Sequence, residues 1–241
     1  MFDPIVQLVQ AELEWFQEVR EQQRAIFPDQ DNLYPIPFFG DIRRAEVLTL
    51  ALNPANTEFS KKRHWWANIH PPEETAPSLT TRLLHYFDLP SPPHHSWFDK
   101  WKEMLLDLNC SYKTNAAHVD LHSLPTKYKD NLDTDQKAFL GNLIQDQSGF
   151  KLGRILSHAP LVKLIIVIDY EVPSASGSQC LGTFDYVRAN IPLLGRHVAE
   201  DGRKPPIFRG GRPDQVAICV FEQRSSLREF LHNAQALKLH D

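Results

Sequence analysis

The chain has 241 residues, of which 42% are hydrophobic, and its 26 basic and 30 acidic residues give a formal net charge of -4. This size and apolar content suit one globular domain with a substantial core, while the charge excludes a globally basic protein, so any nucleic acid would have to bind a local patch. Three cysteines without CxxC spacing argue against a disulfide framework, a four-cysteine zinc site and an iron-sulfur cluster. The cysteine usage indicates a reducing cytosol, and no apolar run is long enough to span a bilayer, so we expect a cytoplasmic protein without a membrane partner. We also expect a monomer.

The first predicted element is an amphipathic helix over residues 4–20, which Asp3 is placed to cap. Apolar residues recur along it at three- and four-residue spacing: Ile5, Leu8, Val9, Leu13, Phe16 and Val19. A proline-stiffened apolar segment, residues 34–40, then leads into the first strand. We expect the helix to pack on the domain and the segment to line one wall of a site beside that strand.

Residues 47–52 are apolar and rich in strand formers, and Asn53-Pro54 ends the run because proline cannot continue a strand ladder. The sequence thus predicts a strand with Asn53 at its carboxyl end. Ligand crevices of open α/β sheets form at the carboxyl ends of strands, so Asn53 is the first candidate for chemistry. The simpler interpretation, a strand followed by an ordinary Asn-Pro turn, stays open.

A basic run and two tryptophans follow this turn: Lys61, Lys62, Arg63, His64, Trp65 and Trp66. Cations beside exposed aromatic rings suit a nucleic acid, because the cations meet phosphates while an indole stacks on a base. Such a run is also common in solvated loops. Prolines then separate two short helical patterns, around residues 80–87 and 96–108.

The second strand is predicted over residues 110–119, with Asn115 near its end. His118, Asp120 and His122 alternate beyond it, so in an extended chain all three would lie on one side, and both residue types bind metals. A metal-dependent hydrolase that uses these three residues is therefore one alternative. Against it, the following Pro125 indicates that the strand has already become a loop.

The rest of the chain predicts further helices and strands in alternation. A helix capped by Asp133 or Thr134 extends to about residue 158, and the apolar runs at 161–168 and 216–221 are typical of parallel strands. Between and after them we expect a loop at 171–177, partial helix over 178–200, a basic loop at 201–213 and a closing helix from about residue 227. This order indicates an α/β fold, a three-layer α/β/α sandwich with a central, mostly parallel four-stranded sheet.

Three short motifs together resemble the uracil-DNA glycosylase superfamily. PIPFFG leading to VLTLALNPANTEF is similar to its first motif, glycine-X-Asn/Asp-Pro after the first strand, and KTNAAH is similar to its second-strand motif. Members carry an aromatic residue thirteen positions beyond the catalytic one, and here that residue is Trp66. The resemblance extends over residues 34–226, and we expect a single domain, 1–241, on which residues 1–33 pack as a helical extension.

The resemblance implies a DNA glycosylase that flips a uracil-like or C5-modified pyrimidine out of single- or double-stranded DNA and hydrolyses its N-glycosidic bond without a cofactor. By that resemblance Asn53 takes the catalytic position, Trp66 stacks on the flipped base, and Asn115 reads its pyrimidine edge. Further contacts with the base or the DNA are assigned to Pro54, Ala55, Lys61, Lys62, Arg63, Arg209, Arg212 and Ser225.

Two departures from the superfamily pattern bear on the chemistry. His-Pro-Ser is common after the fourth strand, whereas this chain has Glu-Gln-Arg-Ser at 222–225, so Gln223 or Arg224 is expected to donate to the departing base. Ala51 replaces the motif glycine, and Ala55 stands where some uracil-specific members have a blocking tyrosine, which implies a pocket for larger bases. A catalytically silent DNA-binding relative is the other alternative.

Overall fold

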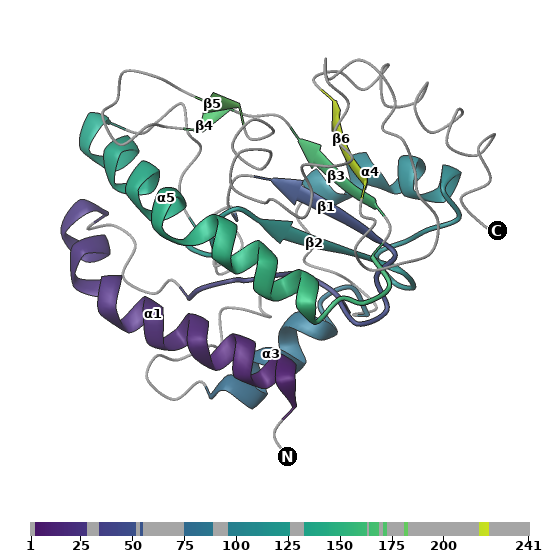
Figure 1. The fold of residues 1–241 in the computed structure, drawn as a ribbon, viewed down its shortest axis with the longest axis horizontal. Coiled ribbons are helices and arrows are strands. Elements are labelled where there is room, and N and C mark those ends of the chain that lie inside the picture. The colour runs from purple at the N-terminus through teal and green to yellow at the C-terminus, as the bar shows by residue number, and fades with distance from the viewer. Residues whose placement is uncertain are drawn as a thin grey trace.

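The computed structural model describes residues 3–27, 34–51, 54, 75–88, 96–125, 133–162, 164–168, 171–172, 181–182 and 217–221. These residues form a parallel sheet with helices around it, which confirms the predicted α/β class (Figure 1). In this part of the chain, no helix combines the length and the apolar character needed to cross a membrane.

The main sheet consists of parallel strands, the first three of which are separated by helices along the chain: β1 (Val47–Ala51), β2 (Ala116–Asp120), β3 (Leu164–Ile168) and β6 (Ala217–Phe221). Their order is β2-β1-β3-β6, and every neighbouring pair is parallel. All residues of β1 and β2 are buried, as in parallel strands that are covered on both faces.

A second, much smaller sheet was not predicted. It pairs β4 (Glu171–Val172) with β5 (Leu181–Gly182) in antiparallel fashion. The expectation of a loop is therefore wrong for Glu171 and Val172, whereas Leu181 and Gly182 fall in a region that was expected to be helical only in part. Strands of two residues are too short to produce a periodic pattern in the sequence.

Four helices accompany the strands in the described residues: α1 (Pro4–Ile26), α3 (Ala76–Leu84), α4 (Ser96–Asp107) and α5 (Thr134–Ser157). Both predicted acidic caps are confirmed. Asp3 accepts a hydrogen bond from the backbone N–H of Ile5 at 2.9 Å, and Asp133 forms a reciprocal capping box with Gln136. α1 ends at Ile26 rather than at residue 20, because the segment after residue 20 contains good helix formers and no glycine or proline.

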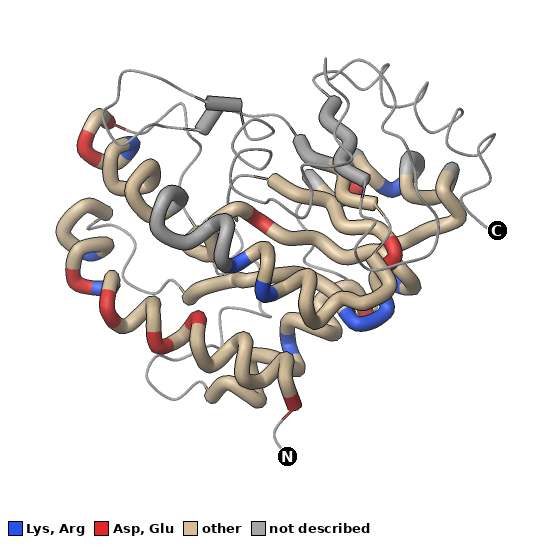
Figure 2. The backbone as a smooth tube through the Cα atoms, in the orientation of Figure 1, with Lys and Arg blue, Asp and Glu red and all other residues tan. Residues whose placement is uncertain are grey.

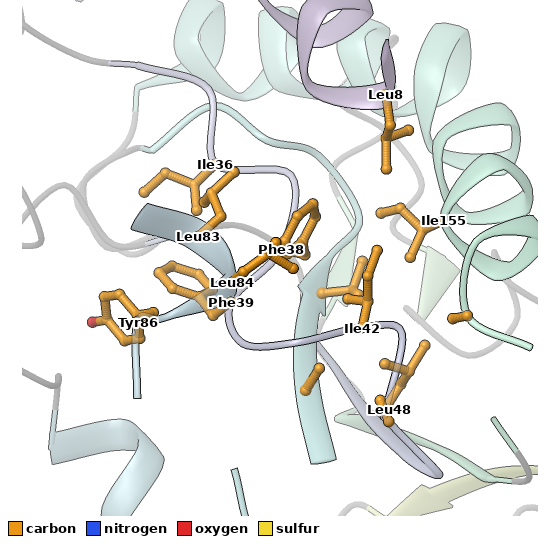
Figure 3. Close-up of a cluster of buried hydrophobic side chains, with 14 of the residues drawn as sticks. Leu8, Ile36, Phe38, Phe39, Ile42, Leu48, Leu83, Leu84, Tyr86 and Ile155 are labelled. Carbon is orange, nitrogen blue, oxygen red and sulfur yellow. The ribbon is translucent and has the colours of Figure 1, made fainter. Parts of the chain in front are cut away.

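The two faces of the sheet have different characters, because successive strand residues point to opposite sides. On one face Leu48 and Leu50 belong to the same apolar cluster as Leu152 and Ile155 of α5 and Leu8 of α1. Figure 3 shows Leu8 and Ile155 approaching each other above Ile42 and Leu48. In Figure 1, α5 lies in front of the strands and α4 behind them. α1 and α5 thus close one face of the sheet with an apolar core.

Candidate functional site

The strands of the main sheet end at one common edge. Ala51 is the register partner of Asp120, Leu50 of Val167, and Ile168 of Phe221. From β1 the chain goes first to β2 on one side and later to β3 on the other side. Such a reversal of strand order is a topological switch point, and in open α/β sheets ligands bind outside the carboxyl ends of the strands at that point.

Two residues bracket the predicted catalytic position at this edge. Ala51 is the last residue of β1, and Pro54 follows three positions later; both are buried. Asn53 itself lies outside the described residues. The same holds for most of the other predicted site residues: Ala55, Lys61, Lys62, Arg63, Trp66, Arg209, Arg212, Gln223, Arg224 and Ser225.

Asn115 does not lie at this edge, so the prediction that it sits near the end of the second strand is wrong. Residues 111–115 close a turn in which the backbone N–H groups of residues 114, 115 and 116 donate to the carbonyl of Ser111. β2 therefore begins at Ala116 instead of residue 110, and Asn115 precedes the strand. Its side chain accepts hydrogen bonds from the Ser111 N–H at 3.2 Å and the Thr114 hydroxyl at 2.9 Å. Asn115 thus stabilises a turn at the amino edge of the sheet.

A chain of polar side chains crosses the other face of the sheet toward the carboxyl edge. The Tyr112 hydroxyl lies 2.8 Å from Thr49 Oγ1, which lies 2.9 Å from Nδ1 of His118. Nε2 of His118 lies 3.2 Å from Oδ1 of Asp120. The rings of Phe39 and Phe98 pack against His118 at centroid distances of 5.7 and 5.4 Å. The imidazole is thus held between apolar rings and two polar neighbours.

The direction of these hydrogen bonds follows from the groups at the two ends. Burial raises the pKa of Tyr112, as does the charge of Asp120, against the lowering effect of the Thr49 hydrogen bond. The phenol therefore stays protonated and can donate to Thr49. If the ring proton of His118 is on Nε2, Nδ1 accepts from the Thr49 hydroxyl, and the Thr49 oxygen accepts from Tyr112. We assign the ring proton to Nε2, because that nitrogen faces a carboxylate.

The Asp120 carboxylate at the end of this chain is buried without hydrogen bonds from the described residues. The residue is 2% exposed, and in the described part of the chain neither Oδ1 nor Oδ2 has a hydrogen-bond partner, since the contact with His118 is close but poorly aligned. A carboxylate in this state is costly to bury, and in folded proteins such groups call for an explanation. Its register partner on β1 is Ala51, the residue that precedes Leu52-Asn53.

The arrangement does not support the metal site considered from the sequence. Within the described ranges, no three His, Cys, Asp or Glu side chains form a group that could hold a metal ion. β2 ends at Asp120, so His122 lies beyond the strand and the predicted alternation stops before it. Both ring nitrogens of His118 already face other groups of the chain. His118, Asp120 and His122 therefore do not act together as a ligand set.

A second polar cluster, which we call the buried charge cluster, links α1, α5 and the segment after β2. It consists of Glu12, Ser123, Lys151 and Arg154. Glu12 is fully buried and accepts hydrogen bonds from the Ser123 hydroxyl at 2.6 Å and from Arg154 at 3.1 Å. Lys151, also fully buried, donates to the backbone carbonyl of Asp120 at 2.9 Å. Figure 2 shows the basic positions in the second half of α5 alongside acidic positions of α1.

Burial governs the protonation of the ionisable groups beside this cluster. It lowers the pKa of Lys151 to about 8; the charges of Glu12 and Asp120 act in the opposite direction, and Arg154 lowers the pKa further. Burial also lowers the pKa of His122 to about 3, as does the charge of Lys151, against the backbone of Leu124. His122 is therefore a neutral imidazole at physiological pH, whereas Lys151 titrates close to physiological pH.

We expect Lys151 to make the protein more stable as the pH rises above 8. Its pKa falls from 10.5 to about 8 on folding, so the unfolded chain binds more protons between these values. The free energy of unfolding should rise across this window by up to roughly 3 kcal/mol, and the gain is lost as the pH falls through 8. Urea titrations at about pH 7.5 and about pH 9.5 measure it, below the range in which tyrosines ionise.

The matched variant for this measurement is Lys151→Met, which keeps an unbranched side chain and removes the titrating group. Its stability should change less between the two pH values than that of the wild-type chain. The same pH response in both proteins would show that Lys151 does not carry the effect.

The buried charge cluster could have been predicted from charged residues that occupy apolar positions of two helices. Glu12 falls within the apolar stripe of α1, between Val9 and Phe16, and Lys151 falls beside Leu152 in the stripe of α5. A charged residue at a core position of an amphipathic helix is rare unless it is paired. Two such residues on two helices therefore predict a buried ion pair or network between them.

Comparisons with known proteins do not identify a family: no protein-family model, no curated protein and no solved structure matches this chain.

Proposed function

We propose that this protein is a DNA glycosylase that hydrolyses the N-glycosidic bond of a flipped uracil-like or C5-modified pyrimidine. The observation that carries the proposal is the position of β1, the strand at the switch point of the sheet, which is followed after one residue by Asn53-Pro54. An open α/β sheet offers its ligand crevice at that point. The proposal includes the finer form of the fold, a three-layer α/β/α sandwich around a four-stranded sheet.

The chemistry needs a flipped nucleotide, because neither water nor side chains reach a glycosidic bond inside a stacked duplex. In the proposal, Trp66 stacks on the extruded base while Lys61, Lys62 and Arg63 neutralise phosphates. Arg209, Arg212 and Ser225 bind the DNA backbone. Ala55 leaves room at C5 of the pyrimidine.

Bond cleavage leaves an oxocarbenium-like sugar and an anionic base, so the site must supply donors to the base and a positioned water. Gln223 or Arg224, which follow Phe221 at the end of β6, would donate to the departing base. Asn53 would hold the water through its amide. An amide does not accept a proton at neutral pH, so the proton of the water must go elsewhere.

Incubation with a panel of labelled oligonucleotides tests the function. The panel carries uracil, hypoxanthine, thymine mismatches and C5-modified pyrimidines, in single and double strands, with and without a chelator. We expect abasic products from uracil or C5-modified pyrimidines, at rates that the chelator does not change. DNA binding without any abasic product would indicate a silent relative, and loss of activity with the chelator would indicate a metal-dependent hydrolase.

The salt dependence of DNA binding tests the basic run. Replacing Lys61, Lys62 and Arg63 together by glutamine should weaken binding to all sequences alike. The negative slope of log K against log salt should become less steep by about 0.9 for each lost phosphate contact. Fluorescence anisotropy at several salt concentrations measures the slope.

A matched triple variant replaces Arg44, Lys102 and Lys113, which are exposed and precede β1 or β2 in the chain. It removes the same charge away from the carboxyl edge and should leave the slope unchanged. If both triple variants lower the slope equally, the basic run is ordinary charged surface.

A further inference from the structure

We propose that Asp120 is a catalytic residue of this site, the carboxylate that positions the attacking water and takes its proton. This inference rests on the proposed glycosylase function and adds the group that Asn53 lacks. Three observations carry it: the place of Asp120 in the sheet, the state of its carboxylate, and the way His118 is held beside it.

The first observation is position. Asp120 is the last residue of β2 and the register partner of Ala51, the last residue of β1. Neighbouring strands lie about 4.8 Å apart, and paired residues point to the same face of the sheet. The Ala51 side chain is only a methyl group, so the neighbour of the carboxylate on β1 is small. Asp120 is thus the described acidic group at the carboxyl edge closest in register to the Asn53 turn.

The second observation is the carboxylate itself. Its two oxygens are buried, and among the described residues none donates a hydrogen bond to either of them. Burying an acceptor without a partner destabilises the folded protein, and the cost is larger when the group is charged. A purely structural residue at this position would be expected to have donors around it, as Glu12 has in the buried charge cluster. Asp120 instead keeps an oxygen available to a donor such as the substrate water.

The third observation is that His118 is fixed in one orientation. Thr49 and Tyr112 hold Nδ1 through a polar chain, and Phe39 and Phe98 pack against the ring. Nε2 therefore faces Oδ1 of Asp120 at 3.2 Å and attracts the negative charge to that oxygen. Oδ2 is the oxygen that stays free to accept from water. His118 is thus a positioning residue, which acts through Asp120.

The arrangement also resembles a nucleophile, base and carboxylate triad made of Thr49, His118 and Asp120, but Thr49 does not fit the nucleophile's role. It lies in the middle of β1 and not at the carboxyl edge, and its hydroxyl is already engaged by Tyr112 and His118. A nucleophile must reach a substrate bound at that edge. The polar chain therefore serves to orient His118.

In the proposed step the C1′–N bond breaks, and its electron pair leaves on the base. The water oxygen forms the new bond to C1′, and one water proton moves to Oδ2 of Asp120. That proton later passes to the departed base or to solvent, which restores the carboxylate. A positioned general base contributes about 10²- to 10⁴-fold to such reactions.

Asp120→Asn is the decisive variant, because it keeps the size of the side chain and removes the proton acceptor. On the best substrate of the panel, its single-turnover rate should fall about 10²- to 10⁴-fold while the Kd for DNA stays within about threefold. Asp88→Asn is the matched control: Asp88 also pairs with a histidine, His85, but on the surface. It should keep the wild-type rate.

His118→Gln and His118→Leu test the positioning role of His118. They also replace Asp120→Asn as the test if the thermal midpoint of that variant shows that it does not fold. Glutamine can still place an N–H near Asp120, so it should keep most of kcat, whereas leucine should lower kcat with little change in KM. A wild-type rate in Asp120→Asn, or equal losses of kcat in both His118 variants, would overturn the inference about Asp120. The proposed function still stands in that case if the wild-type chain excises a base. A wild-type chain that excises no base from the panel overturns the function itself.

Discussion

Asn53→Ala should excise its base at least about a hundredfold more slowly than the wild-type chain while binding the same DNA with a similar Kd. The sugar cation is a strong electrophile, so what the amide supplies is the placement of water and a fixed dipole beside the developing charge. Loss of one such group typically costs 10²- to 10³-fold in kcat. Phosphate contacts dominate affinity for DNA and lie on other residues in the proposal, so binding should survive.

Single-turnover kinetics with labelled oligonucleotides separate the chemical step from product release. Asn142→Ala is the control, because Asn142 is an exposed residue on α5 and its loss removes the same amide from the surface. It should keep the wild-type rate. A wild-type rate in Asn53→Ala would refute the assignment of Asn53 and leave the fold untouched.

Glu12→Ala should destabilise the protein by about 3–5 kcal/mol, the range for breaking a buried ion pair by removing one partner. Its carboxylate accepts from Ser123 and Arg154 and compensates the nearby charge of Lys151. Alanine removes the acceptor of these two hydrogen bonds and the negative charge that faces Arg154 and Lys151. The variant also leaves a cavity where the side chain was, which adds to the cost.

Chemical denaturation of Glu12→Ala and of Glu18→Ala measures this effect. Glu18 is exposed on the same helix, so its replacement should change stability by no more than about 0.5 kcal/mol. Glu12→Gln, which keeps the volume and one acceptor oxygen, should fall between the two. Equal stabilities of the Glu12 and Glu18 alanine variants would show that the buried charge cluster contributes nothing net.

Local chemistry is what made parts of the fold predictable. Asp3 and Asp133 cap their helices as expected, because a cap depends on a few neighbouring residues and backbone N–H groups. β1 and β3 were recognised from their apolar runs, although β3 begins at Leu164 and not at residue 161. Leu161 is half exposed in a turn, which its apolar character alone does not reveal.

The start of β2 and the polar contacts of His118 depend on pairing between distant parts of the chain, so the sequence pattern did not predict them. Residues 110–112 read as strand formers, yet they precede a turn, and only pairing with Val47 sets the start of β2 at Ala116. The contact of Thr49 with His118 joins residues 69 positions apart, so no local pattern announces it. The candidate site was therefore predicted as a strand end with Asn53, without the oriented His118–Asp120 pair beside it.

The proline-rich segment before β1 also bears on solubility, because β2 lies at one end of the main sheet and edge strands invite pairing with other chains. Phe39 bridges His118 in antiparallel fashion, and the N–H of Ile36 donates to the carbonyl of Ser123. The segment thus occupies the hydrogen-bonding edge that β2 would otherwise offer. Pro35 and Pro37 have no N–H to donate outward, so the segment is itself a poor template for a further strand. This edge of the sheet is protected against intermolecular β-pairing, and hence against aggregation that begins there.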